Sequence, residues 1–157
     1  MAIADATDHA YERTFQDHWA DVFRFALAWT NDWAAAEDLA QDAFLRLWDH
    51  RRSLDWSDTV LPWLLVATRR LATDRFRRLR RRMTSAPTLP ASLDPAVHAR
   101  WLDVCSGLRG LSPLERSAIV LTTIEGHTYD EAAIVLGTTA GALRAAVSRA
   151  RTKLENA

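Results

Sequence analysis

The sequence contains few of the residues that interrupt helices or cross-link chains. It has 5 glycines, 5 prolines and 1 cysteine in 157 residues, which excludes a collagen-like, loop-dominated or disulfide-rich fold. Cys105 alone cannot form an internal disulfide or a cysteine-rich metal site, which is typical of a reducing cytosol. No apolar run approaches the roughly 18 residues that span a bilayer, and the start lacks the basic segment of a signal peptide. We therefore expect a cytoplasmic protein without membrane insertion.

The composition is that of an ordinary globular protein, with 48% apolar and 25% charged side chains. Alanine, leucine and arginine are abundant and runs of β-branched residues are rare, so the sequence predicts an all-α fold. It has no cluster of metal ligands, no glycine-rich phosphate loop and no nucleophile with a paired base. We therefore expect no metal, no cofactor and no enzymatic activity.

Apolar residues at helical spacing divide the first half of the chain into three helices. The first is predicted over residues 11–29 and the second over 34–51. A loop is expected over 53–59. Pro62 suits the first turn of a third helix, which contains no further proline or glycine and runs to about residue 82. These helices predict an N-terminal domain over residues 11–82.

The character of the sequence changes between residues 83 and 98. This segment carries three prolines among threonine, serine and alanine, has no helical period, and is expected to be a linker. Helical patterning resumes at Ala99. The chain is therefore predicted to consist of two small helical domains, 11–82 and 99–157, joined by the proline-containing linker 83–98.

The second domain carries two copies of the capping-box pattern, which predict helices beginning at Pro113 and Tyr129. Gly137 can adopt the left-handed conformation that ends a helix, and a last helix is expected over 140–154. Its predicted buried stripe consists of Leu143, Val147, Ala150 and Leu154. Two short helices joined by a tight turn are typical of a DNA-binding helix-turn-helix, although a helical hairpin without a DNA role has the same pattern.

Charge is unevenly distributed although the formal net charge is zero. Residues 1–50 contain 3 arginines against 10 acidic residues, a net charge of −7. Residues 69–82 contain 8 arginines against Asp74 alone, a net charge of +7. Such a chain can offer an acidic face to one partner and a basic face to a nucleic acid. The alternative is that two solvated faces neutralise each other.

The second predicted helix combines acidic groups with a leucine on one face. At about 100° per residue, this face contains Asp38, Gln41, Asp42, Leu45 and Asp49. The opposite face, expected to be buried, contains Ala40, Ala43 and Leu47. An apolar residue surrounded by charges suits contact with a basic protein partner. Isolated surface leucines are also common, so the pattern is equally compatible with a protein interface and with an ordinary solvent-exposed surface.

Two basic surfaces are predicted. The arginines of residues 69–82 follow Trp56 and Trp63 and are interleaved with Phe76, a combination typical of single-stranded nucleic-acid binding. Mutual repulsion among clustered arginines disfavours a simple solvated face. Opposite its apolar stripe, the last helix offers groups that can read guanine or hold phosphate: Arg144, Ser148, Arg149, Arg151 and Lys153.

Three motifs occur in a fixed order along the chain. They are AEDLAQDAFLRLW at 36–48, PWLLVATRRLATDR at 62–75, and a split motif with LSPLER at 111–116, GHTYDEAA at 126–133 and SRAR at 148–151. Together they resemble the extracytoplasmic-function group of sigma-70-family sigma factors, the dissociable promoter-recognition subunits of bacterial RNA polymerase. In that family the first motif docks on the polymerase clamp helices, the second reads the minus-10 element and the third reads the minus-35 element.

The resemblance implies three sets of site residues. The set for core RNA polymerase is Asp38, Gln41, Asp42 and Trp48, to which the stripe geometry adds Leu45. The set for the melted minus-10 strand of promoter DNA is Trp63, Arg69, Arg70, Asp74, Arg75, Arg77 and Arg78. The set for duplex minus-35 DNA is Thr139, Arg144, Ser148, Arg149, Arg151 and Lys153. An anti-sigma factor is also expected, because the family is commonly held inactive by one.

The chain departs from the family's pattern at two places. Arg70 stands where asparagine is common, at a site implicated in handling a flipped-out minus-10 base, so base preference there is expected to differ. Ala142, Ala145 and Ala146 stand where polar or basic residues are usual, which predicts weaker contact with the minus-35 duplex.

Two other functions are compatible with parts of the sequence. A sigma-like decoy would sequester an anti-sigma protein without touching DNA, which the arginine-rich segment disfavours. A stand-alone helix-turn-helix repressor leaves the acidic stripe of the second helix unexplained.

Overall fold

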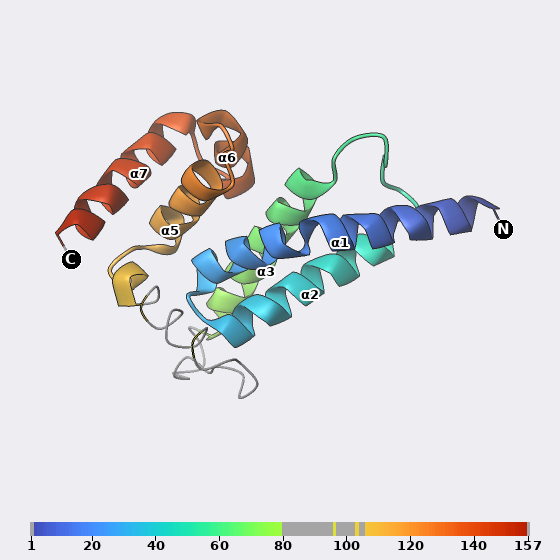
Figure 1. The fold of residues 1–157 in the computed structure, drawn as a ribbon, viewed down its shortest axis with the longest axis horizontal. Helices are drawn as coiled ribbons and strands as arrows, with labels where there is room; N and C mark the ends of the chain where they lie inside the picture. The colour runs from blue at the N-terminus through green and yellow to red at the C-terminus, as the bar shows by residue number, and fades with distance from the viewer. Residues whose placement is uncertain (1, 80–95, 97–102, 104–105, 157) are drawn as a thin grey trace.

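The computed structural model describes residues 2–79, 96, 103 and 106–156, with side chains for residues 6–78, 96, 103 and 106–156, and among these residues it contains helices and no strand. The N-terminal group consists of α1 (Ala2–Thr30), α2 (Trp33–His50) and α3 (Leu61–Leu79). The C-terminal group consists of α5 (Pro113–Ile119), a short π-helical segment η1 (Val120–Ile124), α6 (Tyr129–Leu136) and α7 (Ala140–Glu155). Figure 1 shows α1 and α2 running alongside each other, with the C-terminal group packed at one end of the α1–α3 bundle. The prediction of an all-α fold is confirmed.

The first helix begins at Ala2, well before its predicted start at residue 11. The prediction relied on large apolar residues, which begin at Tyr11, whereas the preceding turns are rich in alanine, the residue with the highest helix propensity. Asp8 on these turns also pairs with Arg51, whose Nε lies 3.1 Å from Oδ1. Propensity and this contact together account for the longer helix.

The breaks between the N-terminal helices follow from local chemistry. Asp32 caps α2, and its Oδ1 accepts the N–H of Ala35 at 2.8 Å. The expected loop over 53–59 is present, and Pro62 lies in the first turn of α3. The predicted continuation of this helix to residue 82, most of the linker 83–98 and the resumption of helix at Ala99 lie outside the described residues.

Both predicted capping boxes are present before the C-terminal helices. The hydroxyl of Ser112 accepts the N–H of Glu115 at the start of α5, and the hydroxyl of Thr128 accepts the N–H of Glu131 at the start of α6. Gly137 follows α6 with φ of 63°, a left-handed conformation that favours glycine. The predicted pair of helices joined by a tight turn is confirmed.

The apolar stripe of α7 is buried at Leu143, Val147 and Ala150, as its spacing predicts. The same spacing predicts burial of Leu154, and this prediction is wrong, because that side chain is 38% exposed. Leu154 belongs to the last turn of α7, where fewer neighbouring elements cover the helix. Helical periodicity gives the direction of a side chain but not the extent of the surface that covers it.

The two groups of helices share a hydrophobic core. Phe25 of α1 and Leu65 of α3 are almost fully buried, and they pack in one cluster with residues of the C-terminal group. Those partners include Leu121, Leu136, Leu143 and Val147. Separating the groups would expose these apolar side chains to water, so the contact between the groups contributes to stability.

Candidate protein and nucleic-acid interfaces

The outer face of α2 is exposed, which confirms the predicted orientation of the helix. We call Asp38, Gln41, Asp42 and Leu45 the acidic face; all four are exposed, and Leu45 retains 60% of its accessible surface. The opposite residues Ala40, Ala43 and Leu47 are fully buried. A leucine that lies among carboxylates and makes no core contact is available to a protein partner.

Trp48, also predicted to bind the polymerase, is held by neighbours within the chain. Its ring makes an edge contact with Tyr11 at a centroid distance of 5.0 Å, and the guanidinium of Arg51 lies 3.6 Å from its centroid. Arg51 also pairs with Asp8. Trp48 therefore fastens the start of α1 to the end of α2 and is half-buried, so it can offer a partner only part of its surface.

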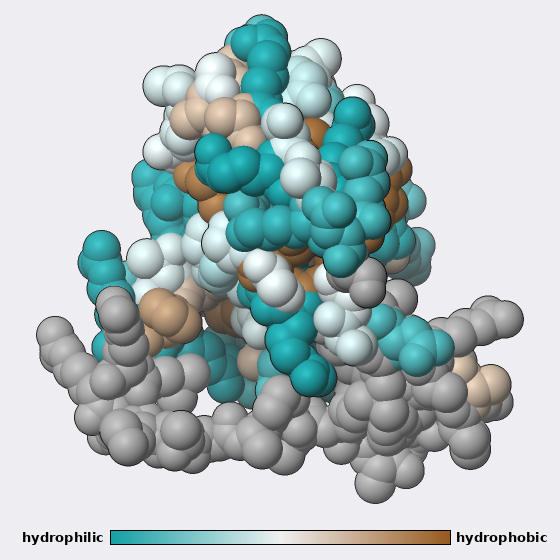
Figure 2. All heavy atoms as spheres, turned by 90° about the vertical axis from the view of Figure 1, so that its left-hand side faces the viewer, coloured by the Kyte–Doolittle hydropathy of each residue, from teal (hydrophilic) through white to brown (hydrophobic). Residues whose placement is uncertain are grey.

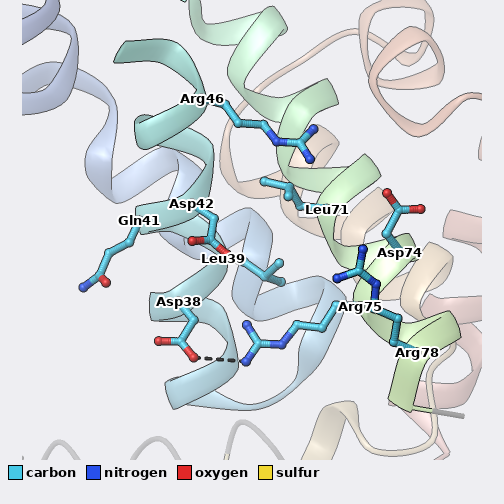
Figure 3. Close-up of a pocket in the computed structure, with 9 residues that line it drawn as sticks. All are labelled: Asp38, Leu39, Gln41, Asp42, Arg46, Leu71, Asp74, Arg75 and Arg78. Carbon is cyan, nitrogen blue, oxygen red and sulfur yellow. Dashed lines mark hydrogen bonds and ion pairs between the residues drawn. The ribbon is translucent and has the colours of Figure 1, made fainter. Parts of the chain in front are cut away.

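A groove of about 430 Å³ separates the acidic face of α2 from α3. Figure 3 shows carboxylates of α2 facing arginines of α3 across it, with Asp38 Oδ2 paired to Arg75 Nη2 at 3.0 Å. Asp74, Arg78 and Arg46 also line the groove. The predicted polymerase-contact set and the predicted minus-10 set therefore meet, and one ion pair joins them. At this pair, an acidic and a basic surface neutralise each other, as in the alternative considered for the uneven charge distribution.

Arg69 of α3 lies against the C-terminal group. Its Nε donates a hydrogen bond to the carbonyl of Val135 at 2.8 Å, and a Cβ at Gly137 would come within 3.2 Å of its guanidinium carbon. Glycine at this turn thus serves two needs, a positive φ and room for the arginine. The minus-10 role of Arg69 stays a prediction, because in this conformation its guanidinium holds α6.

Arg70 and Trp63 line a second groove, of about 460 Å³, along the first half of α3. Arg70 is exposed and has no hydrogen-bond or ion-pair partner among the described residues. Trp63 is half-buried, and its ring lies 5.6 Å from that of His50. Arg46 and His50 of α2 contribute to the same groove. A cation and an aromatic ring thus border one concave surface.

The last turns of α3 are solvent-facing. Arg77 and Arg78 are exposed, and Phe76 retains 58% of its accessible surface. Trp56 lies apart from them, because its Nε1 donates to the carbonyl of Arg51 at 2.8 Å in the loop before α3. The structure therefore brings Phe76, and not Trp56, close to the arginine-rich end of the helix.

Two contacts between the helix groups were not predicted from the sequence. Arg116, only 8% exposed, donates to the carbonyls of Ala28 and Trp29 at 2.6 and 3.0 Å, at the end of α1. Arg24 makes an ion pair through two nitrogens with Glu125, which raises the pKa of the arginine. Both pairs join residues about 90 to 100 positions apart, where no local pattern can indicate contact.

The predicted minus-35 residues of α7 fall on two flanks. On one, Arg144 lies 5.1 Å from the ring centroid of Tyr129, and it lines with Arg151 a polar cleft of about 610 Å³. On the other, Arg149 and Lys153 both approach Glu115 of α5. Figure 2 shows the end of the molecule that carries α5 and α7, where hydrophilic side chains, in teal, lie among paler and more hydrophobic ones.

Other exposed residues of α7 are small. Ser148, Ala142 and Ala145 are exposed, and Thr139 caps α7, its hydroxyl accepting the N–H of Ala142 at 3.1 Å. Ala146 is fully buried, so its assignment to the recognition surface was wrong. A larger residue at Ala146 would meet the core instead of DNA. The cations of α7 therefore border an outward surface with few hydrogen-bonding groups.

Residues 2–79 and 106–156 contain no grouping of three or more histidine, cysteine or acidic side chains placed to hold a metal ion. In the same part of the chain, no helix combines the length and the apolar character needed to cross a membrane.

Two family models match the chain. One, described as sigma-70 region 2, matches residues 14–82, and the other, described as sigma-70 region 4, matches residues 107–154. The first range begins within α1 and includes all of α2 and α3, and the second covers α5, η1, α6 and nearly all of α7.

Individual proteins are similar over nearly the whole chain. The ECF RNA polymerase sigma factor SigC of Mycobacterium tuberculosis is 31% identical over 98% of this chain and 86% of its own length. The probable RNA polymerase sigma factor RfaY of Xanthomonas campestris is 34% identical over 98% of this chain, which spans only 41% of that relative's length. The sigma factor RpoE of Bartonella quintana, crystallised with the anti-sigma factor NepR, matches with a TM-score of 0.75 at 25% identity, over 93% of this chain and 94% of that one.

Proposed function

The chain belongs to the extracytoplasmic-function sigma factors of the sigma-70 family, which direct promoter-specific transcription by bacterial RNA polymerase, and we propose that three of its surfaces divide this task. The acidic face of α2 binds core polymerase, the arginines of α3 hold the melted minus-10 strand, and α7 docks on the minus-35 duplex. The domains 11–82 and 99–157 and the linker 83–98 are part of this proposal. Nucleotide addition is the chemistry of the polymerase, so this subunit catalyses no reaction. Like the polymerase, it acts in the cytoplasm.

The contrast between Leu45 and Leu47 carries the polymerase assignment. The two leucines lie two positions apart on one helix, yet Leu45 is 60% exposed and Leu47 is fully buried. Leu47 stabilises the fold, whereas Leu45 contributes little to it. An exposed apolar residue flanked by Asp42 and Asp38 suits a basic helical surface on the polymerase.

The groove beside Arg70 supports the minus-10 assignment. A base that leaves the duplex stack needs an aromatic or planar surface and a nearby cation for its phosphate. Trp63 and Arg70 supply both along the first half of α3, and Arg77 and Arg78 extend the cationic surface toward its C-terminal end. Arg69 joins this surface only if it releases Val135.

The exposed cations of α7 support the minus-35 assignment. Arg144 and Arg151 lie on one flank, and Arg149 and Lys153 lie on the other. Phosphate contacts made from two flanks fix the position of a recognition helix in a groove. Because the exposed Ala142 and Ala145 of the same helix carry no hydrogen-bonding side chain, we expect phosphate contacts to contribute more than contacts with base edges.

An anti-sigma factor is part of the proposal. The similar sigma factor from Bartonella quintana was solved as a complex with an anti-sigma factor, and the match extends over 93% of this chain. A protein that covered the acidic face would exclude the polymerase.

The proposal is tested by mixing the full chain with core polymerase and a promoter library. Promoter-specific binding and run-off transcripts should appear only when both proteins are present, and they should decline steeply as salt is raised. Leu45→Arg should abolish polymerase binding and transcripts while leaving the melting temperature nearly unchanged. Leu47→Arg is the matched control, and it should destabilise the fold by several kcal/mol because it buries an unpaired charge.

Two results would contradict the assignment. If Leu45→Arg and Leu47→Arg unfold the protein equally, the acidic face is a core face. If the chain alone binds a specific duplex tightly, the chain does not depend on polymerase to recognise promoter DNA.

A further inference from the structure

The chain contains two capping boxes of the same design. Before α5, the N–H of Ser112 donates to Glu115 Oε2 at 2.9 Å, and the N–H of Glu115 donates to Ser112 Oγ at 3.2 Å. Before α6, Thr128 and Glu131 make the equivalent pair at 2.8 and 3.2 Å. In each box the glutamate satisfies a backbone N–H that the helix itself cannot. The local task of the two glutamates is therefore the same.

The two glutamates differ in everything else that they contact. The side chain of Glu131 is 62% exposed, and its ion-pair neighbour is His127 at 4.0 Å. The side chain of Glu115 is only 5% exposed, and two cations of α7 converge on it. Lys153 Nζ lies 3.1 and 2.9 Å from its two oxygens, and Arg149 Nε lies 3.4 Å away. Glu131 demonstrates that capping requires neither burial nor a lysine and an arginine on the carboxylate, so the surroundings of Glu115 serve another purpose.

The carboxylate of Glu115 is charged in spite of its burial. Burial by itself favours the neutral acid, but hydrogen bonds from Lys153 and Ser112, with the nearby Arg149, leave its pKa below the ordinary value. At neutral pH, Glu115 is thus a fixed negative charge that faces α7. Both α7 cations gain a partner without leaving the surface.

Arg149 and Lys153 keep a free side toward solvent. Their side chains are 57% and 49% exposed although both are paired. Arg149 approaches Glu115 through Nε, and a guanidinium has four further N–H donors on its terminal nitrogens. It can therefore hold Glu115 and a phosphate at the same time.

We propose that Glu115 is a positioning residue for minus-35 recognition. It does not touch DNA but holds Arg149 and Lys153 in set directions on α7, and this inference rests on the proposed minus-35 role of that helix. Long side chains that are ordered before binding lose less conformational freedom when they meet their target. The same negative charge weakens sequence-independent attraction to phosphates. Glu115 therefore increases discrimination between promoters at some cost in general DNA affinity.

The test uses the full chain with core polymerase and two templates. One is a promoter selected from a library, and the other is the same promoter with a scrambled minus-35 element. Glu115→Gln keeps an acceptor for Ser112 but removes the charge, so the ratio of transcripts from the two templates should fall roughly five- to tenfold. Binding to the scrambled template at low salt should not weaken. The matched control Glu131→Gln, in the other capping box, should leave the ratio unchanged.

The effect must also depend on the two cations. In the double variant Arg149→Ala with Lys153→Ala, the further change Glu115→Gln should no longer alter the ratio. Glu115→Asp, which keeps the charge but withdraws it by one methylene, should lower the ratio as well, and it provides the measurement if Glu115→Gln does not fold.

Three outcomes overturn the inference. The first is an unchanged transcript ratio in Glu115→Gln. The second is an equal loss of transcripts from both templates, which indicates a purely structural role for Glu115. The third is a further fall in the ratio when Glu115→Gln is added to the double variant, because Glu115 would then act without the two cations. If the double variant itself leaves the ratio unchanged, the proposed minus-35 role of this flank fails together with the inference.

Discussion

The cations of α3 and those of α7 are held by different kinds of partner. On α3, Arg75 pairs with Asp38 of the acidic face, and Arg69 binds a carbonyl of α6. On α7, Arg149 and Lys153 share Glu115, a buried residue of their own helix group. The partners of the α3 cations thus belong to surfaces with other tasks, whereas the partner of the α7 cations has no competing interface.

This difference has a consequence for the order of binding. For Arg69 and Arg75 to reach a DNA strand, the first must leave α6 and the second must leave the acidic face. Polymerase docking on Asp38 removes one of these contacts, and separation of the helix groups removes the other. Arg149 and Lys153 can bind phosphate without such an exchange, because their outer sides are already exposed. We therefore expect the α3 surface to respond to partners and the α7 surface to be preformed.

The largest expected effect is at Arg116, which joins the helix groups. Arg116→Ala should lower the free energy of unfolding by about 3 kcal/mol or more, because it leaves the carbonyls of Ala28, Trp29 and Leu111 without this charged donor. Urea unfolding of the full chain measures the change. The exposed Arg109 provides the control, and Arg109→Ala should change stability by less than about 0.5 kcal/mol. Equal stability of the two variants would mean that the helix groups do not stabilise each other through Arg116.

Adjacent arginines of α3 provide the next comparison. Arg69→Ala should lower the free energy of unfolding by about 1–2 kcal/mol, because the carbonyl of Val135 loses a charged donor. Arg70→Ala should leave stability within about 0.5 kcal/mol, since that side chain is exposed. Urea titrations of both variants distinguish the two positions. If Arg69→Ala is as stable as the unsubstituted protein, the hydrogen bond from Arg69 to Val135 does not stabilise the fold.

The role of Arg70 should be visible in transcription. Arg70→Ala should reduce open-complex formation by roughly five- to tenfold across many promoters, because a phosphate contact acts on all sequences alike. Arg70→Asn should change which minus-10 base is preferred. Permanganate footprinting with a promoter library, in the presence of core polymerase, measures both. Unchanged activity and preference in both variants would remove Arg70 from the site.

The smallest effect is expected at the ion pair between Asp38 and Arg75. Both side chains are partly exposed, so the pair is worth less than about 1 kcal/mol. Asp38→Asn should raise the affinity of the polymerase-free chain for a single-stranded minus-10 oligonucleotide by up to about fivefold at low salt. Fluorescence anisotropy measures this binding, and the gain should disappear in an Arg75→Ala background. Asp42→Asn is the control, because Asp42 lines the same groove without an ion pair to α3. An equal gain from Asp42→Asn would indicate a general charge effect.

Sequence patterns predicted the features that depend on near neighbours. The two capping boxes, the left-handed Gly137 and the opposite faces of α2 all appear where spacing placed them. The start of α1 was predicted too late, because alanine-rich turns carry no apolar period. Burial of Leu154 was predicted in error, since periodicity does not report where the covering elements end.

The sequence by itself determined which helices form, which faces are apolar and which segments carry each sign of charge, because these properties arise within a few residues of one another. Only the tertiary structure decided the partners of the charged groups. Arg69 meets Val135, Arg116 meets the end of α1 and Glu115 meets Lys153 across long stretches of chain. An arginine has the same charge whether it faces solvent, a carbonyl or a carboxylate. The packing of the helices around the shared core decides which of these three the arginine meets.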